Sequence, residues 1–253
     1  VFKQESWSPE TGRWYHLAVV RAEGLVHFYI NGVELGSGSQ GSRDLTGSYP
    51  LHIGADLAGN WGMNGYLDDF RISKGIARSF SPTTLPTQEY TSDAYTKLLL
   101  HFNGTRYEEQ NTTYTQEGDL QVATTTDFLG ILKVEKKDSQ GRVTYLKERR
   151  PETINQGFGP EFQVSGNPRI DKNQFQAGEG SAYFDGGRDG TVDYLQIPPS
   201  PSLDLGSENF TIDFWVKPDS LPSHQVLLTT GSISTGVPRG FGIQAEGARL
   251  QVL

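Results

Sequence analysis

The chain has 253 residues, with 30 glycines, 13 prolines, an aromatic content of 11%, no cysteine and a formal net charge of −8. This composition is typical of many short strands joined by tight turns, and it excludes disulfides and thiolate metal sites. The acidic balance argues against nucleic-acid binding, and no apolar run approaches the roughly 18 residues of a membrane-spanning helix.

Residues 1–80 contain a series of strand-length runs. From Val26 to Ile30 every second residue is apolar, and Asn31-Gly32 follows directly. Period-two alternation closed by Asn-Gly is a strong hairpin signal. The runs "PLHIGAD" and "GYLDDFRIS" are two further strands bounded by glycine or proline. These patterns predict half of an all-β sandwich.

Residues 81–95, "SPTTLPTQEYTSDAY", combine two prolines with serine, threonine and aspartate. This composition favours a linker between two segments, or alternatively an irregular surface loop of one domain. A new strand-like pattern, "TKLLLHFNG", begins at Thr96.

Several of these stretches resemble laminin-G-like domains of the concanavalin A-like lectin/glucanase superfamily. In residues 1–80, "WYHLAVVR", "FYINGVELG" and "GYLDDFRISKGIAR" are similar to the second half of such a domain. In residues 96–105 and 177–253, "TKLLLHFNG", "SAYFDG" and "FTIDFWVKPDSL" are similar to its first half. The resemblance implies an all-β fold, a concanavalin A-like jelly-roll β-sandwich.

The order of the two halves leaves three interpretations open. The chain is a circular permutant that closes into one sandwich, or a window from an array of tandem sandwiches, or a pair of halves that each complete a neighbouring subunit. A half sandwich alone would expose its core face and unpaired strand edges, so isolated halves are not expected.

Residues 106–176 form an insertion longer than the usual loop of the family. Its centre predicts a hairpin, with strands at 131–137 and 142–147 around a turn at 138–141. Residues 131–150 contain seven basic and three acidic side chains in an otherwise acidic chain. The hairpin is either a solvated, charged structure or an arm that docks on an acidic surface of another copy or another assembly protein.

The sequence offers no sign of a catalytic centre. Glucanases of the superfamily carry an alternating acidic motif of the type E-x-D-x-E, which does not occur here. The nearest carboxylates are Asp213, Asp68 and Asp69, and strand alternation predicts that the last two point to opposite faces. We therefore expect no enzyme activity, and a glycoside hydrolase ranks third among the possible functions.

Calcium is the one cofactor that the sequence leaves open. Asp185, Asp189 and Asp193, in "YFDGGRDGTVDYL", could supply the oxygen ligands that this ion prefers. The alternative is that Asp185 and Asp189 build turns with the glycines that follow them.

Exposed aromatic residues on loops predict a site for glycans. Trp61 lies in the Gly/Asn-rich stretch "ADLAGNWGMNGY" and is the best candidate, flanked by Asn60 and Asn64. Trp7 is the second candidate. Interface contact or simple loop packing are the alternatives for Trp61.

These observations favour a non-enzymatic extracellular recognition or assembly module, located on a virion or a cell surface. The motifs are similar in sequence to those of laminin-G-like domains that are common in bacteriophage virion proteins and large bacterial surface proteins. The first hypothesis is therefore a structural protein of a virion (fibre, tip or capsid decoration) or of a surface filament. The alternative is a carbohydrate-binding adhesin module. An assembly protein should bury the insertion against other copies, whereas a lectin should leave Trp61 exposed.

Overall fold

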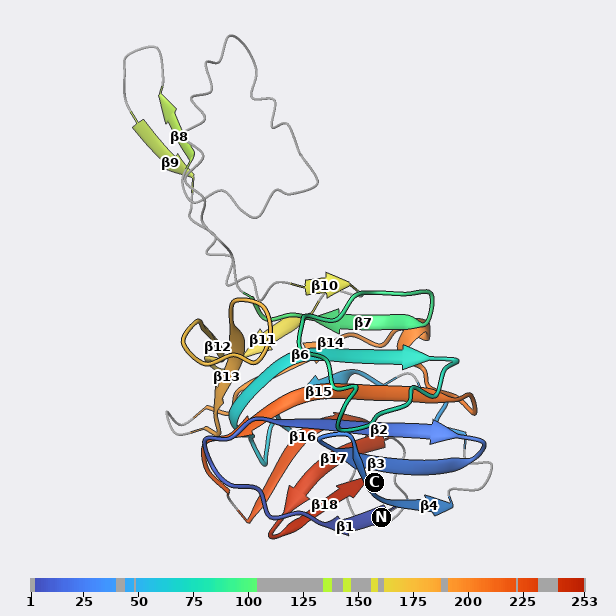
Figure 1. Ribbon diagram of the computed structural model, residues 1–253. Coiled ribbons are helices and arrows are strands. Elements are labelled where there is room, and N and C mark those ends of the chain that lie inside the picture. Colours follow the sequence, from blue (N-terminus) through green and yellow to red (C-terminus); the bar gives the residue numbers. More distant parts are fainter. Residues whose placement is uncertain are drawn as a thin grey trace. The chain divides into compact units, whose positions relative to one another are not determined.

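The computed structural model describes residues 3–39, 44–47, 49–103, 134–137, 143–146, 156–158, 162–187, 191–221, 223–231 and 241–252 (Figure 1). The chain forms two compact units, one made of Val1–Gly104 with Ile154–Leu253 and the other of Thr105–Thr153. The described residues are almost all in antiparallel strands or loops, with one short 3-10 helix at Pro201–Leu203. No helix among them has the length and apolar character needed to cross a membrane.

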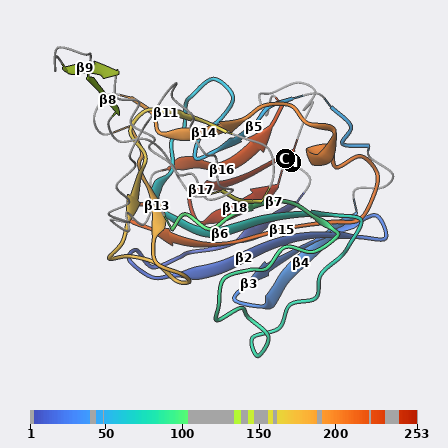
Figure 2. The same cartoon turned by 90° about the horizontal axis from the view of Figure 1, so that it is seen from above.

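Within the described residues, the first unit contains two sheets. The seven-stranded sheet has the order β1 (Lys3–Ser6), β18 (Arg249–Val252), β17 (Phe241–Glu246), β16 (His224–Thr230), β5 (Leu51–Ile53), β14 (Tyr194–Ile197) and β11 (Gln163–Ser165). The nine-stranded sheet has the order β10 (Gln156–Phe158), β7 (Thr96–Leu100), β6 (Asn64–Lys74), β15 (Phe210–Pro218), β2 (Tyr15–Ala22), β3 (Leu25–Ile30) and β4 (Val33–Ser39). In addition, β13 (Ser181–Asp185) pairs with β6, and β12 (Arg169–Asp171) pairs with β13. The two sheets face each other as a sandwich (Figure 2).

The core lies between the two sheets because alternate residues of the long strands, such as β15, are apolar. On β15, Phe210, Ile212, Phe214 and Val216 are buried in the core cluster. The intervening residues, among them Asp213, face the other side of this sheet, which we call its outer face. The architecture is the concanavalin A-like jelly-roll sandwich expected from the sequence.

Strands from both ends of the chain alternate within the sheets. β15 lies between β2 and β6, with Ile212 opposite Val19 on one side and Ile72 on the other. β1 pairs with β18, with Gln4 opposite Gln251. The two segments that resemble the two halves of a laminin-G-like domain therefore share both sheets.

The second part of the expected insertion contributes to the sandwich. β10 pairs with β7, β11 with β14 and β12 with β13. These three strands thus extend the sheets, although the sequence assigned them to an insertion that runs to residue 176. These strands are only three residues each, too short to give a periodic signal.

The second unit contains an antiparallel pair, β8 (Val134–Lys137) and β9 (Val143–Leu146). Both strands lie within the ranges expected for the basic hairpin, and the turn at 138–141 lies outside the described residues.

Candidate functional site

The connection from β6 to β7 crosses the outer face of the nine-stranded sheet instead of turning tightly (Figure 2). We call residues 76–91 of this connection the strap. The ring of Phe80 lies 5.1 Å from that of His16 on β2 and 5.6 Å from that of Tyr29 on β3. Residues 81–95, expected to be a linker, contain no strand and lie within the first compact unit. They cover the sheet.

A buried polar cluster lies beneath the strap. Asp213 accepts two hydrogen bonds from Arg71, at 3.1 Å from Nε and 2.7 Å from Nη2. The carboxylate also lies 3.8 Å from Nε2 of His16, which bonds the hydroxyl of Tyr90 at 2.8 Å. The Arg71 guanidinium stacks on the Tyr90 ring, 3.9 Å from its centroid. The strap is thus joined to β2, β6 and β15 at one point.

The surroundings of Asp213 and Tyr90 in this cluster shift their pKa values in opposite directions. Burial by itself would raise the pKa of Asp213, yet His16 and the Arg71 guanidinium together lower it. Burial raises the pKa of Tyr90 well above its ordinary value, and the Asp213 charge adds to this. Asp213 is therefore held as a carboxylate, and Tyr90 as a neutral hydroxyl that can donate a hydrogen bond.

Asp69 anchors the strap a second time. It accepts a hydrogen bond from the backbone N–H of Tyr90 at 2.6 Å and another from Nδ1 of His101 at 2.7 Å. His101 also lies 3.6 Å from Glu89. Burial opposes the charged form of His101, but the hydrogen bond and charge of Asp69 outweigh it and raise the pKa of the imidazole.

A β-bulge interrupts the alternation expected for Asp68 and Asp69. The register places Arg71 opposite Asp213 but Asp68 opposite Trp215, so β6 has one extra residue, and Asp69 has φ of 48°. Both carboxylates are fully buried and both accept backbone hydrogen bonds. The prediction of opposite faces is therefore wrong, because a bulge removes the period-two geometry on which it rested.

Asp68 is buried with an incomplete set of hydrogen-bond partners in the described part of the chain. It accepts hydrogen bonds from the backbone of Gln176 at 2.7 Å and Ala177 at 2.9 Å, and its Oδ1 has no partner among the described residues. Burial raises the pKa of Asp68 to about 7, despite these hydrogen bonds. This carboxyl group therefore keeps its proton to a higher pH than an exposed aspartate does, and it is closed off from solvent.

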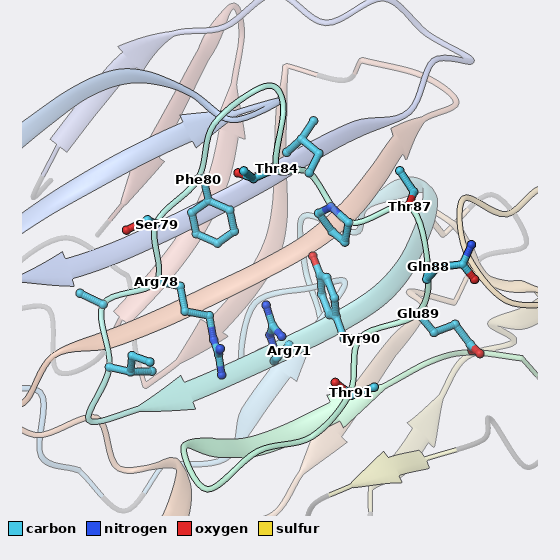
Figure 3. A pocket seen from close by; sticks show the side chains of 14 residues that line it. Arg71, Arg78, Ser79, Phe80, Thr84, Thr87, Gln88, Glu89, Tyr90 and Thr91 are labelled. Atoms are coloured by element: carbon cyan, nitrogen blue, oxygen red, sulfur yellow. The ribbon is translucent and has the colours of Figure 1, made fainter.

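The strap forms, together with Arg71 of β6, an open pocket of about 690 Å³. Figure 3 shows the side chains of Arg71, Arg78, Phe80 and Tyr90 between the two limbs of the strap, above β6 and β15. Sequence reasoning missed this pocket. Its only signal was the length and proline content of the 81–95 segment, which a linker shares.

Trp61, the best sequence candidate, lies on the loop between β5 and β6 and is 52% exposed. Its ring stacks on that of His224 with 4.5 Å between centroids and 18° between planes. Its carbonyl accepts the N–H of Val226 at 2.8 Å, and Asp56 accepts the N–H of Asn60 at 2.7 Å. The loop is thus fixed on β16 while the indole remains at the surface.

The other proposed ligand residues have different surroundings. Asn60 is exposed beside Trp61, whereas Asn64 is buried and its Oδ1 has no partner among the described residues. Trp7 is only 7% exposed and packs edge to face on Tyr15, at 5.9 Å. Of the two tryptophans proposed, Trp61 alone offers a surface ring.

Two of the three proposed calcium ligands lie in the described part of the chain, and Asp189 lies outside it. Asp193 accepts the N–H groups of Asn167 at 2.6 Å and Asp185 at 2.9 Å. Asp185 accepts the N–H of Gly187 at 2.7 Å, as in an Asx turn. No cluster of three or more potential metal ligands occurs among the described residues.

Comparison with known proteins gives one match. Residues 3–81 match the family model of the concanavalin A-like lectin/glucanases superfamily, of the laminin-G type, which confirms the resemblance seen in residues 1–80. No curated protein and no solved structure matches the chain significantly.

Proposed function

We propose that this laminin-G-like sandwich is a non-enzymatic, extracellular recognition module of the adhesion type that binds carbohydrate through Trp61. The observation that carries the proposal is the indole itself, exposed on a loop that is fixed in position. One face of the ring rests on His224, so the exposed surface includes the opposite face. An aromatic face held in this way suits the apolar C–H face of a sugar ring.

The backbone at Trp61 supports the proposal. Its φ is 56°, in the left-handed region that a bulky residue rarely adopts. Such a conformation costs on the order of 1–3 kcal/mol and is concentrated at functional sites. The fold sustains this cost at an exposed tryptophan, with Asn60 beside it to supply hydrogen bonds to hydroxyl groups.

The burial and hydrogen bonding of three carboxylates support the non-enzymatic part of the proposal. Asp68, Asp69 and Asp213 are fully buried beneath loops, and each accepts hydrogen bonds from the protein. Glycoside hydrolysis needs two carboxyl groups that reach the same glycosidic bond. These three groups instead hold the strap and the neighbouring loop.

The test is glycan binding by the wild-type chain and by Trp61→Ala, measured on a broad library of immobilised glycans and then by calorimetry. Phe175→Ala is the matched control, because Phe175 is a 42% exposed aromatic residue elsewhere on the sandwich. We expect Trp61→Ala to weaken binding at least about tenfold, equivalent to about 1.4 kcal/mol, with the control unchanged. A library in which Trp61→Ala weakens binding to no glycan, or a library without a ligand, contradicts the proposal.

A second candidate is an assembly role, as a structural part of a virion or surface filament. The observation that favours it is the separate unit at Thr105–Thr153 with the β8–β9 pair, in the most basic stretch of an acidic chain. In this hypothesis the unit docks on the acidic sandwich of another copy or of another assembly protein. The molar mass in solution tests it: oligomers that dissociate with Lys136→Glu and Lys137→Glu support assembly, and a monomer at all concentrations contradicts self-association.

A further inference from the structure

We propose that the pocket between the strap and the nine-stranded sheet is a second binding site, for an uncharged polyhydroxylated molecule the size of one or two sugar units. The inference extends the proposed function, on which it rests for the ligand class, and it concerns residues distinct from Trp61.

The pocket has the volume of a small-molecule site. Its volume of about 690 Å³ lies within the range of roughly 300–1,000 Å³ typical of ligand pockets. The strap that forms its wall is held by the Tyr90 hydroxyl on His16 and by the Tyr90 N–H on Asp69. The wall is therefore in place before a ligand enters.

The charges at the pocket favour a neutral ligand over an anion. Arg71 is paired with Asp213 at 2.7 Å, and Arg78 is paired with Asp93 at 2.7 Å. Glu89 also lines the pocket. Two cations thus face three anions, and an added phosphate or carboxylate would meet no net positive charge.

The same arginines retain hydrogen-bonding capacity. Arg71 uses Nε and Nη2 for Asp213, while Arg78 uses Nε for Ser73 and Nη2 for Asp93. For both guanidinium groups, Nη1 has no hydrogen-bond partner among the described residues. Held in fixed orientation, these donors suit the hydroxyl oxygens of a polyol.

The remaining wall combines rings with small polar residues. Phe80 and Tyr90 lie on opposite limbs of the strap, as Figure 3 shows. Thr84, Thr87 and Thr91 line the space between them. A few polar groups among aromatic surfaces is the composition that positions a small polar ligand with an apolar face.

The experiment uses the full chain and a panel of glucose, galactose, mannose, N-acetylglucosamine, maltose, lactose and cellobiose. Binding is detected by saturation-transfer NMR and titrated by calorimetry. Thr87→Phe places a ring in the pocket from an exposed strap position, and Thr83→Phe is the control at an exposed strap position that does not line it. Sodium sulfate and sodium phosphate at constant ionic strength form the anion arm.

In the Trp61→Ala background, which lacks the other proposed site, we expect at least one sugar still to bind, Thr87→Phe to weaken this binding at least about tenfold, and Thr83→Phe to leave it unchanged. If Thr87→Phe lowers the melting temperature, Arg78→Lys replaces it, because lysine keeps the charge but lacks the planar fork. Sugar binding lost with Trp61→Ala and kept with Thr87→Phe overturns the pocket and leaves the proposed function standing. The pocket proposal is also overturned if only sulfate or phosphate binds, or if no sugar of the panel binds. The role of Trp61 is tested separately by the glycan library.

Discussion

The hydroxyl of Tyr90 lies 2.8 Å from Nε2 of His16, although 74 positions separate the two residues in the chain. Tyr90 is 6% exposed and His16 is fully buried, so this bond holds a loop onto a sheet from which water is excluded. The backbone N–H of the same tyrosine bonds Asp69 at 2.6 Å. One residue thus ties the strap to two strands.

Tyr90→Phe should destabilise the fold. The substitution keeps the ring but removes the hydroxyl, which leaves Nε2 of buried His16 without this partner. A buried polar group that loses its hydrogen bond costs about 1–3 kcal/mol in the free energy of unfolding. Urea denaturation measures the change. Tyr95→Phe is the control, because Tyr95 is 45% exposed, and equal effects of the two substitutions would contradict this role for Tyr90.

Gly32 has two separate reasons to be glycine. Its φ is 76°, and a Cβ built on it would lie 2.3 Å from the carbonyl carbon of Ser81 in the strap. Gly12 has the same φ of 76° with nothing within 4 Å of such a Cβ. Comparison of Gly32 with Gly12 therefore separates the effect of backbone strain from the effect of contact with the strap.

Gly32→Ala should therefore be more destabilising than Gly12→Ala. Both substitutions carry the strain of the left-handed conformation, about 1–2 kcal/mol. Only Gly32→Ala must also displace the Ser81 backbone, so amide exchange should rise in the strap of that variant alone. Thermal unfolding and hydrogen exchange by mass spectrometry check this. An equal loss of stability in the two variants, with no change in amide exchange in the strap, would show that the contact with Ser81 does not affect stability.

Asp68 should make stability fall as pH rises. Its folded-state pKa is raised to about 7 from an ordinary value of 3.8, chiefly by burial, so the folded state binds more protons between these values. The free energy of unfolding then decreases with pH across this window, at up to about 1.4 kcal/mol per pH unit. His101, whose pKa is also raised, adds a loss in the same direction above its ordinary value of 6.5.

Asp68→Asn should flatten the part of this slope between about pH 4 and pH 6, where His101 does not yet titrate. Urea denaturation at half-unit pH steps measures it. His101→Gln is the comparison, because it should leave the lower part of the slope intact and reduce the upper part. Wild-type and Asp68→Asn profiles with the same slope between pH 4 and pH 6 would contradict the raised pKa of Asp68.

The strands of the sandwich were predictable because their side chains follow a simple period. Val26 to Ile30 alternate and form β3, and Asn31-Gly32 forms the turn that follows. The motif-bearing stretches of both halves lie in the two sheets, since their apolar positions require a common core. Trp61 was identified from its glycine-rich surroundings, and the structure places it at the surface.

The strap and the bulge were not predictable from local pattern. A segment such as 81–95 contains the same residues whether it links two bodies or covers a sheet, and the difference depends on Tyr90 reaching His16 and Asp69. The bulge at Asp69 arises from the pairing of β6 with β15, which involves a strand about 140 residues away. Both features depend on tertiary contacts between distant segments of the chain, and the periodicity of the sequence does not reveal these contacts.

The unit at Thr105–Thr153 should be dispensable for the folding of the sandwich. Gln156 on β10 lies opposite Leu100 on β7 in an antiparallel pair, so the chain leaves and re-enters the sheet at neighbouring positions. A hairpin loop of about four residues can join two such strands. Replacement of residues 105–153 by Gly-Asn-Gly-Ser should therefore preserve the fold, with a cooperative thermal transition close to that of the full chain. A control that instead deletes β15, which lies between β2 and β6, should abolish this transition. Loss of cooperative unfolding in the replacement variant would show that the sandwich needs the second unit, and it would strengthen the assembly role over an independent binding module.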